Sequence, residues 1–317
     1  MSYQEHISKL FLDIENEVGI TKMDDLVLSS LCRAIHDYRE CSEEDFFAQF
    51  YELFETIKNT QPRISLVIDH FFHLWKILCD AQAKPHPEGH LFWEKKILQA
   101  IKGFRKNIRE EKKRMVKSGA AQIKNGDVIL VHSLSSSVLD SLSRGKRKGK
   151  KFRVIIAEQE VEKTQKLIEK LTKSRISFQV VPEYMLTHIE GEVSKVFLGA
   201  VTLNSNLNIV GDAGMNAVVS EFHLRKTPVY LFMLTRKFSL WKSSSSHHRY
   251  KAKTTRTHGY MPITFERIKF SHDRVPHGLF DFFITEQGKM TSKDLSAEYQ
   301  KRFKEREKWR KEFFKED

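Results

Sequence analysis

The sequence predicts an α/β protein, with an N-terminal helical domain followed by a Rossmann-like parallel-sheet domain. From residue 5 to residue 78, apolar side chains recur at three- and four-residue spacing, as in amphipathic helices. From residue 125 onward, short apolar runs alternate with helical segments of about 10–15 residues, which is typical of a parallel sheet with right-handed crossovers. The charge also changes along the chain: residues 1–100 hold 10 Lys/Arg and 17 Asp/Glu, and the other 217 residues hold 44 and 24. These observations indicate two modules with different surfaces.

We expect the helical domain to span residues 1–119. Turn signals separate its segments at Gly19, Cys41-Ser42 and Gln61-Pro62, and Ser42 with Asp45 forms a helix N-cap pattern. The stretch 83–89 (AKPHPEG) is typical of a linker. His70 and His73 share a helix face with aromatic residues, so we interpret them as packing residues and predict no metal there.

A long connecting helix is predicted over residues 91–119. One face carries an apolar stripe: Ile97, Ile101, Phe104, Ile108 and Met115. The opposite face carries seven cations: Lys102, Arg105, Lys106, Arg109, Lys112, Lys113 and Arg114. We interpret this face as solvated. Contact with nucleic acid is the alternative, which no interleaved aromatic residues support.

The Rossmann-like domain is predicted over residues 120–317. Strands are expected at 127–133 (DVILVHS), 152–158 (FRVIIAE), 176–181 (ISFQVV), 196–200, 229–234 and 279–285. Helices are expected at 134–142, 161–172 and 293–314, and a basic loop at 144–151. No GxGxxG or Walker motif occurs, so neither a dinucleotide nor any other cofactor is predicted.

The segment 193–235 is the most informative stretch of this domain. An apolar strand ends on Gly199-Ala200, an Asn-rich polar loop is expected at 202–208, and Gly211-Asp212-Ala213-Gly214 precedes a short helix at 215–224. In a parallel sheet, ligand loops lie at the carboxyl ends of the strands. A buried βαβ unit without a ligand would produce the same pattern.

Residues 238–260 form a basic insertion rich in serine and histidine, which we expect to be a surface loop. The adjacent His247 and His248 have no cysteine or acidic neighbours, so no metal site is predicted. Cys32, Cys41 and Cys79 are widely spaced and favour reduced thiols in a cytoplasmic protein. No apolar run approaches the roughly 20 residues that span a bilayer, and no secretory signal or membrane attachment is expected.

Several motifs occur in a fixed order: NGDVILVHSLSSSVL, FRVIIAEQE, VFLGAVTLNSNLNIVGDAGMNAV, PVYLF and FFITEQGKMTS. In this order they resemble the family of the alpha, beta and delta regulatory subunits of translation initiation factor 2B. The same family holds the methylthioribose-1-phosphate and ribose-1,5-bisphosphate isomerases. The alpha-type subunit is the expected match. The resemblance covers roughly residues 91–296.

The resemblance implies a degenerate ligand pocket. It comprises His132, Ser133, Ser135, Glu158, Val201, Asn206, Asp212 and Gly214. Ser133 stands where the isomerases have a cysteine, and Val201 stands where they have an aspartate. Moving a proton between adjacent carbons needs such groups, so no catalytic residue and no isomerase activity are expected.

The phosphate-binding positions also differ from those of the isomerases. After Glu158 the sequence has a second acidic residue, Glu160, where the isomerases have an arginine. Asp212 stands where the isomerases have a lysine. Additional carboxylates repel a phosphate. Asn206 and Gly214 do match the family pattern.

The resemblance implies a non-enzymatic regulatory or assembly protein that binds translation initiation factor 2 or sister subunits. Two alternatives stay open: a diverged sugar-phosphate isomerase or phosphorylated-metabolite sensor, and a nucleic-acid-binding protein that uses the basic half. We also expect a homodimer or hetero-oligomer formed through the Rossmann-like domain. Phe282 and Phe283 must face opposite sides of their strand, so one aromatic set needs a cover.

Overall fold

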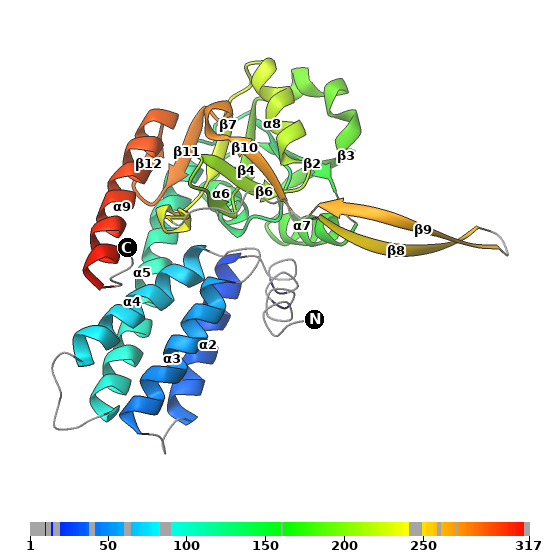
Figure 1. Ribbon diagram of the computed structural model, residues 1–317. Coiled ribbons are helices and arrows are strands. Elements are labelled where there is room, and N and C mark those ends of the chain that lie inside the picture. The colour runs from blue at the N-terminus through cyan, green and yellow to red at the C-terminus, as the bar shows by residue number, and fades with distance from the viewer. Residues whose placement is uncertain are drawn as a thin grey trace.

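A computed structural model describes residues 10, 14, 20–37, 42–59, 65–82, 90–159, 161–240, 249–258, 261–270 and 272–313. The linker 83–89, the turn signals at Gly19, Cys41 and Gln61-Pro62, and the adjacent His247 and His248 lie outside the described residues. Within the described part, the chain forms a helical bundle followed by a mixed, mostly parallel sheet with helices on both faces (Figure 1).

Among the described residues, the N-terminal region holds four named helices: α2 (Ile20–Asp37), α3 (Glu43–Lys58), α4 (Ser65–Gln82) and α5 (His90–Ala121). The predicted cap of α3 is confirmed, because the Asp45 N–H donates to Ser42 Oγ at 3.1 Å. The bundle core is dominated by large apolar side chains, among them Phe47, Phe50, Phe54, Phe71, Phe72 and Trp93. His70 is buried in it, paired with Asp24 and stacked on Phe104.

Helix α5 is longer than the other described helices of the bundle and confirms the predicted helix at 91–119. Its apolar stripe serves two cores: Ile97 and Ile101 pack in the bundle, whereas Ile108 and Met115 pack under the sheet. The helix therefore joins the two parts of the molecule (Figure 1).

Seven strands form the main sheet: β1 (Val128–Val131), β2 (Arg153–Glu158), β3 (Ser177–Pro182), β4 (Lys195–Gly199), β7 (Val229–Phe232), β11 (Phe282–Thr285) and β12 (Gly288–Met290). Their spatial order is β12-β11-β7-β4-β1-β2-β3, and only β12 runs antiparallel to its neighbour. The chain runs outward from β1 to β3 and then returns to β4 on the other side of β1. Ligand crevices in open α/β sheets lie at this type of reversal.

Helices cover both faces of the sheet. On one face α5, α6 (Ser136–Arg147) and α7 (Val161–Lys173) enclose a core that includes Ile129 and Val131. On the other face α8 (Met215–Leu224) and α9 (Ser292–Phe313) enclose a core that includes Leu130. Successive side chains of β1 point to opposite faces of the sheet, and both faces are buried. Short 3₁₀ turns complete the chain: η1 (Glu183–His188), η2 (Glu190–Glu192), η3 (Thr235–Lys237) and η4 (His277–Leu279).

The polar stretch 202–208, expected as a loop, is a loop only over 204–207, where it forms the tight turn of a β-hairpin. β5 (Thr202–Leu203) and β6 (Asn208–Asp212) pair antiparallel, and β10 (His272–Pro276) extends them to three strands. The Asn204 side-chain oxygen accepts the N–H groups of Asn206 and Asn208, at 3.0 and 2.9 Å, which closes the turn. The Asn204 side chain therefore satisfies two backbone N–H groups of the turn.

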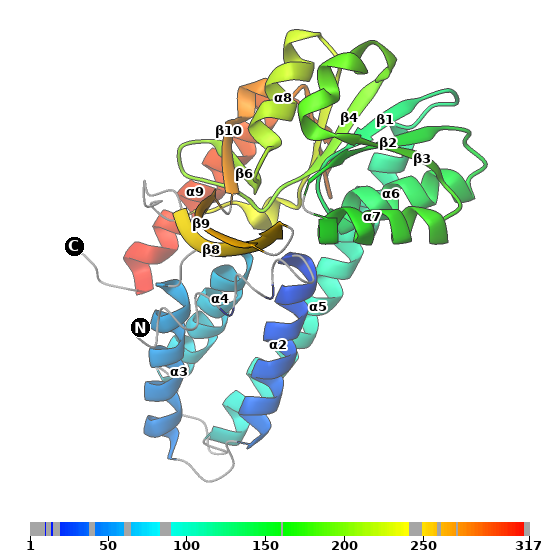
Figure 2. The same cartoon turned by 90° about the vertical axis from the view of Figure 1, so that its right-hand side faces the viewer.

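Two further loop expectations were wrong in part. The first residues of the basic stretch 144–151 complete the last turn of α6, where cations complement the helix dipole. The second half of the insertion 238–260 forms β8 (Arg249–His258), which pairs with β9 (Met261–Phe270) in a hairpin that projects from the body (Figures 1 and 2). Threonines in β8 favour extended backbone.

The aromatic side chains of the sheet's C-terminal half pack within the chain, although Phe282 is only partly buried. Phe280 and Phe283 pack in the core beside α9, with ring centroids 5.8 Å apart. On the other face Tyr230 contacts Phe282 at 5.0 Å, and the Lys289 ammonium lies 4.1 Å from the Phe282 ring centroid. The aromatic argument for a second chain is therefore not supported.

Candidate functional site

The candidate site lies where β1, β2 and β4 end. His132 and Ser133 follow β1, Glu158 ends β2, and Gly199-Ala200 ends β4. Because β1 and β4 are adjacent and parallel, their carboxyl ends meet at one edge of the sheet. The topology therefore brings these strand ends to the same edge of the sheet, and the pocket there stays a prediction.

His132 is at the centre of the site, and its side chain is fully buried. Its Nε2 lies 3.2 Å from Glu183 Oε2 and 2.8 Å from the Gln159 side-chain nitrogen. Gln159 also donates to the Ala213 carbonyl at 3.0 Å. A protonated Nε2 donates to Glu183, and an unprotonated Nε2 accepts from Gln159, so the proton on His132 selects its partner.

Glu183 also closes the space in front of helix α8. Gly214 precedes that helix with φ 95°, and a Cβ added to Gly214 would lie 2.4 Å from Glu183 Oε1. Glycine is required at this position for both the backbone angle and the close approach of the carboxylate. An acidic side chain near a helix N-terminus is electrostatically favourable.

A second carboxylate binds the first N–H groups of α8 directly. Asp273 Oδ2, on β10, accepts the Gly214 N–H at 3.0 Å and the Asn216 N–H at 2.9 Å. The N-terminus of a helix is a common binding place for phosphate. Here the chain's own carboxylate occupies it.

One lysine does approach the pocket. Lys163, on α7, lies 3.3 Å from Asp212 Oδ1, with both side chains largely buried. The acid that replaces a cation in the family pattern is therefore itself paired with a cation. This pairing reduces its repulsion of an anion and also occupies the lysine.

The remaining predicted pocket residues have structural roles. Ser133 is buried, and Ser135 caps α6 by accepting the Val138 N–H at 3.4 Å. Val201 packs against the helical-bundle core, and its N–H donates to the Val210 carbonyl. Asn206 is exposed in the β5–β6 turn. The structure therefore brings His132, Asp212 and Gly214 together at the start of α8, through Gln159 and Glu183. Glu158 ends β2 opposite Pro182, Val201 packs on the helical bundle, and Asn206 lies in the β5–β6 turn.

Sequence reasoning missed Glu183 and Asp273. A signal existed for Glu183, because it follows Pro182 at the carboxyl end of β3. No local signal identified Asp273, which reaches the site only because β10 pairs with β6, placing it opposite Gly211.

The described residues include no cluster of histidine, cysteine or acidic side chains that could hold a metal ion. Among those residues, no helix has both the length and the apolar character needed to cross a bilayer. The ionisable side chains in contact at the site are the imidazole of His132, the carboxylates of Glu183, Asp212 and Asp273, and Lys163, which is paired with Asp212.

A family model described as "Initiation factor 2 subunit family" matches residues 18–292. A translation initiation factor eIF-2B subunit 2-like protein of Pyrococcus furiosus is 30% identical over 136 residues, which cover 43% of this chain and 49% of the relative. The translation initiation factor eIF2B subunit delta of Dictyostelium discoideum is 28% identical over 144 residues, 45% of this chain and 23% of the relative. The matches thus span half or less of these relatives. They are of subunit 2-like and delta types, and they do not support the expected alpha type in particular.

The ribose 1,5-bisphosphate isomerase of Archaeoglobus fulgidus is 20% identical over 203 residues, 63% of this chain and 62% of the relative. Among solved structures, the tetrameric eIF2B-beta2-delta2 complex of C. thermophilum superposes with a TM-score of 0.70 at 16% identity, over 95% of each chain. The Pyrococcus horikoshii OT3 translation initiation factor eIF-2B gives 0.66 at 22% identity, over 86% of this chain and 90% of its own. These structures share the fold.

Proposed function

We propose that this chain, which belongs to the initiation factor 2 subunit family, is a non-enzymatic regulatory or assembly subunit. In this role it binds translation initiation factor 2 or sister regulatory subunits. Its relatives include both initiation-factor subunits and an isomerase, so family membership leaves two classes of function open. The choice between them depends on the pocket.

The observation that carries the proposal is the occupied N-terminus of α8. Asp273 accepts two of its backbone N–H groups, and the Glu183 carboxylate lies against Gly214. A phosphate ester would have to displace the first carboxylate and approach the second. Like charges at such distances in a partly buried site cost several kcal/mol at an effective dielectric constant of about 20.

The positions of the expected acid–base pair support the same conclusion. Ser133 carries a hydroxyl, whose proton is too weakly acidic to be transferred near neutral pH without an adjacent base. Val201 has no ionisable group, and its side chain packs on the helical bundle. A carboxylate at position 201 would have to be accommodated against that apolar core.

One observation favours the enzymatic alternative. The buried His132 contacts the Glu183 carboxylate at 3.2 Å, and such a pair can transfer protons. A diverged isomerase or a sensor of a phosphorylated metabolite would use this pair. Turnover of ribose 1,5-bisphosphate and methylthioribose 1-phosphate tests it directly, against a genuine isomerase under identical conditions. We expect activity lower by at least ~10²–10⁴, the usual contribution of general acid–base catalysis; turnover within tenfold would establish an enzyme.

Partner binding tests the proposal itself. The full chain is mixed with purified translation initiation factor 2, and separately with beta-type and delta-type subunits, and analysed by size-exclusion chromatography with light scattering. We expect a defined complex with at least one of them, and the identity of the bound subunit shows which subunit type this chain replaces. Elution of the chain alone at tens of micromolar in every mixture would contradict the proposal. The chain alone, in the same experiment, tests the proposed homodimer.

A further inference from the structure

The main sheet has two edge strands, and they differ in how well they are protected. At one end β12 is three residues long, runs antiparallel to β11 and carries Lys289. A short edge strand with a lysine resists pairing with another chain. At the other end β3 has six residues, SFQVVP, none of them charged, and no described strand pairs with its outer edge (Figure 2). The edge at β3 is therefore open to a further strand.

Helix α7 turns an uncharged side toward this open edge. Val180 of β3 is 37% exposed and lies on the same face of the sheet as Phe178, which packs in the core under α7. One side of α7 carries Lys170 and lies toward α6, close enough for Lys170 to interact with Asp140. The residues on the opposite side, three and four positions apart, are uncharged: Val161, Gln165, Ile168 and Thr172.

Apolar side chains are also exposed after β3, on the 3₁₀ turn η1. Tyr184 is 81% exposed and Met185 is 41% exposed. Together with β3 and the four uncharged residues of α7, they make up what we call the edge strip. Exposed apolar side chains that gather beside an open strand edge are typical of a contact with another chain.

Opposite charges lie near the two ends of the edge strip. Because α7 connects two parallel strands, it begins at the carboxyl ends of the strands and returns to their amino ends. Glu162, in the first turn of α7, is exposed at one end. Lys173 and Arg175, at the end of α7 and just before β3, are exposed at the other. Glu162 and Lys173 are ~17 Å apart along the helix, at 1.5 Å per residue.

We propose that β3 pairs antiparallel with β3 of a second copy of this chain, which joins the two main sheets edge to edge across a two-fold axis. In a two-fold contact, residues near the axis face the same residues of the other copy, so a charge there would face its like. The uncharged edge strip meets this requirement. The antiparallel direction also brings the Glu162 end of one α7 to the Lys173 end of the other. The inference rests on the proposed function, because it names the surface through which a homodimer forms.

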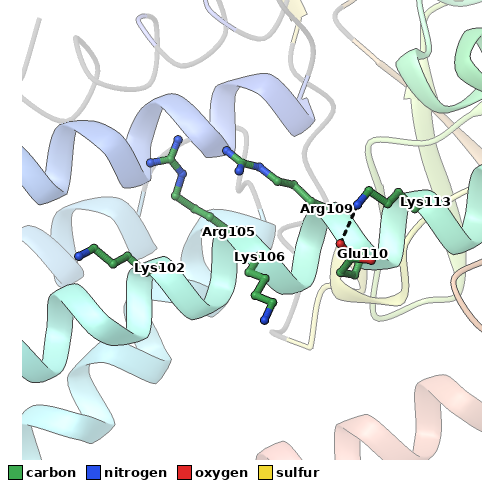
Figure 3. A pocket seen from close by; sticks show the side chains of 6 residues that line it. All are labelled: Lys102, Arg105, Lys106, Arg109, Glu110 and Lys113. Carbon is green, nitrogen blue, oxygen red and sulfur yellow. Dashed lines mark hydrogen bonds and ion pairs between the residues drawn. The ribbon is translucent and has the colours of Figure 1, made fainter.

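The row of cations on α5 does not suit such a contact. Five cations lie along one side of this helix with a single acid, Glu110, among them: Lys102, Arg105, Lys106, Arg109 and Lys113 (Figure 3). A second copy placed there would bring cations against cations, and like charges across an interface are strongly unfavourable. The charge distribution therefore favours the sheet edge over α5 for pairing between copies.

The first test measures the mass of the full chain by light scattering over a dilution series that begins at tens of micromolar. We expect a dimer for the wild type. Val180→Lys places like charges close to the two-fold axis and should weaken dimerisation at least tenfold. Leu91→Lys is the matched control, because Leu91 is 50% exposed at the start of α5, in the bundle, and should leave the dimer unchanged. Circular dichroism checks that both variants fold.

Charge reversals test the antiparallel direction, at exposed helix positions that do not endanger folding. Glu162→Lys and Lys173→Glu should each weaken dimerisation several-fold, since the two-fold axis repeats every contact. The double reversal should restore the dimer, and the ~17 Å between the two positions prevents a rescue within one copy.

A dimer that Val180→Lys leaves intact, or single reversals that the double reversal does not rescue, would overturn the inference. A wild type that stays monomeric at tens of micromolar but binds a sister subunit would overturn it and leave the proposed function standing. A dimer that depends on the edge strip, in a chain that binds neither translation initiation factor 2 nor a sister subunit, would support the inference and count against that part of the proposed function.

Discussion

Asp273 shows how a single side chain can change what a pocket accepts. The start of α8 has the two features that bind phosphate in many proteins, a glycine with positive φ and free N–H groups at a helix end. Asp273 removes the second feature, because its carboxylate accepts the Gly214 and Asn216 N–H groups. The helix end is thereby satisfied without a ligand.

We expect Asp273→Ala to make the N-terminus of α8 available to an anion. The substitution leaves two N–H groups without an acceptor and should lower the free energy of unfolding by about 1–2 kcal/mol, the usual loss for a helix cap. Inorganic phosphate should restore part of the loss in the variant but not in the wild type, at ionic strength matched with chloride. Thermal unfolding with and without phosphate measures both effects. An identical response to phosphate in the two proteins would show that the place is not an anion site.

His132 illustrates what sequence could and could not reveal about the site. Its position after β1 was predictable, because strand ends in a parallel sheet face one edge. Its contact with Glu183 was not predictable, since it depends on how η1 folds back beyond β3. Val201 was expected at the pocket, yet the hairpin of β5 and β6 turns it toward the helical bundle.

At the scale of elements, the helices and the strands with an apolar run were predictable, and the polar strands were not. The predicted strands at 127–133, 152–158 and 176–181 correspond to β1, β2 and β3. By contrast, β5 and β6 are joined by an asparagine-rich turn, and β8 has no run of apolar residues. Pairing partners decide such strands, and partners are not visible in a local pattern.

Helix α9 begins with a capping arrangement that sequence reasoning overlooked. The Asp294 N–H donates to Thr291 Oγ1 at 3.3 Å, and Asp294 Oδ2 accepts the Thr291 N–H at 2.9 Å. Leu295 and Tyr299, one and two turns later, are buried against the sheet. The cap therefore fixes where the packing face of α9 starts.

We expect Thr291→Ala to lower the free energy of unfolding by about 1 kcal/mol, which corresponds to a few degrees in Tm. The companion variant Asp294→Asn tests the charge. Hydrogen bonds from the Thr291 backbone and side chain hold the pKa of Asp294 below its usual value. A folded pKa below the unfolded one adds stability above the unfolded pKa of about 3.9, and this stability is lost as pH falls through the folded pKa.

The difference in Tm between wild type and Asp294→Asn should therefore be constant from pH 8 to pH 5 and shrink below pH 4. Circular dichroism melts across this range provide the measurement. For Thr291→Ala, the matched control is Thr291→Ser, which keeps the hydroxyl and should melt close to the wild type. A difference for Asp294→Asn that grows as pH falls would contradict the assignment.

At the scale of the whole molecule, the helical bundle and the sheet are held together by more than α5. Ser65 of the bundle hydrogen-bonds Thr202 of β5 at 3.0 Å. Arg306 of α9 lies 3.2 Å from the ring centroid of Phe72 and 3.1 Å from Asp69, both on α4. Because the two parts share these contacts, we expect them to unfold together. The domain boundary between residues 119 and 120 stays a prediction from the sequence.

A further contact of this kind joins α5 to the turn after β7. Arg236 Nε and Nη2 donate to the two carboxylate oxygens of Glu111 at 2.6 and 2.9 Å, and the side chains are only 20% and 14% exposed. Two-pronged pairs that are largely removed from water couple more strongly than pairs on the surface. The pair therefore contributes to holding α5 against the turn after β7.

A double-mutant cycle of Glu111→Gln, Arg236→Met and their combination should give a coupling energy of about 1–3 kcal/mol, since each single change strands a largely buried charge. Urea unfolding with the full chain gives the four free energies. The neighbouring pair Glu110 and Lys113, on the exposed face of the same helix, is the matched control and should show no measurable coupling. Equal coupling in the two cycles, or none for Glu111 and Arg236, would mean that this ion pair does not help to hold the two parts together.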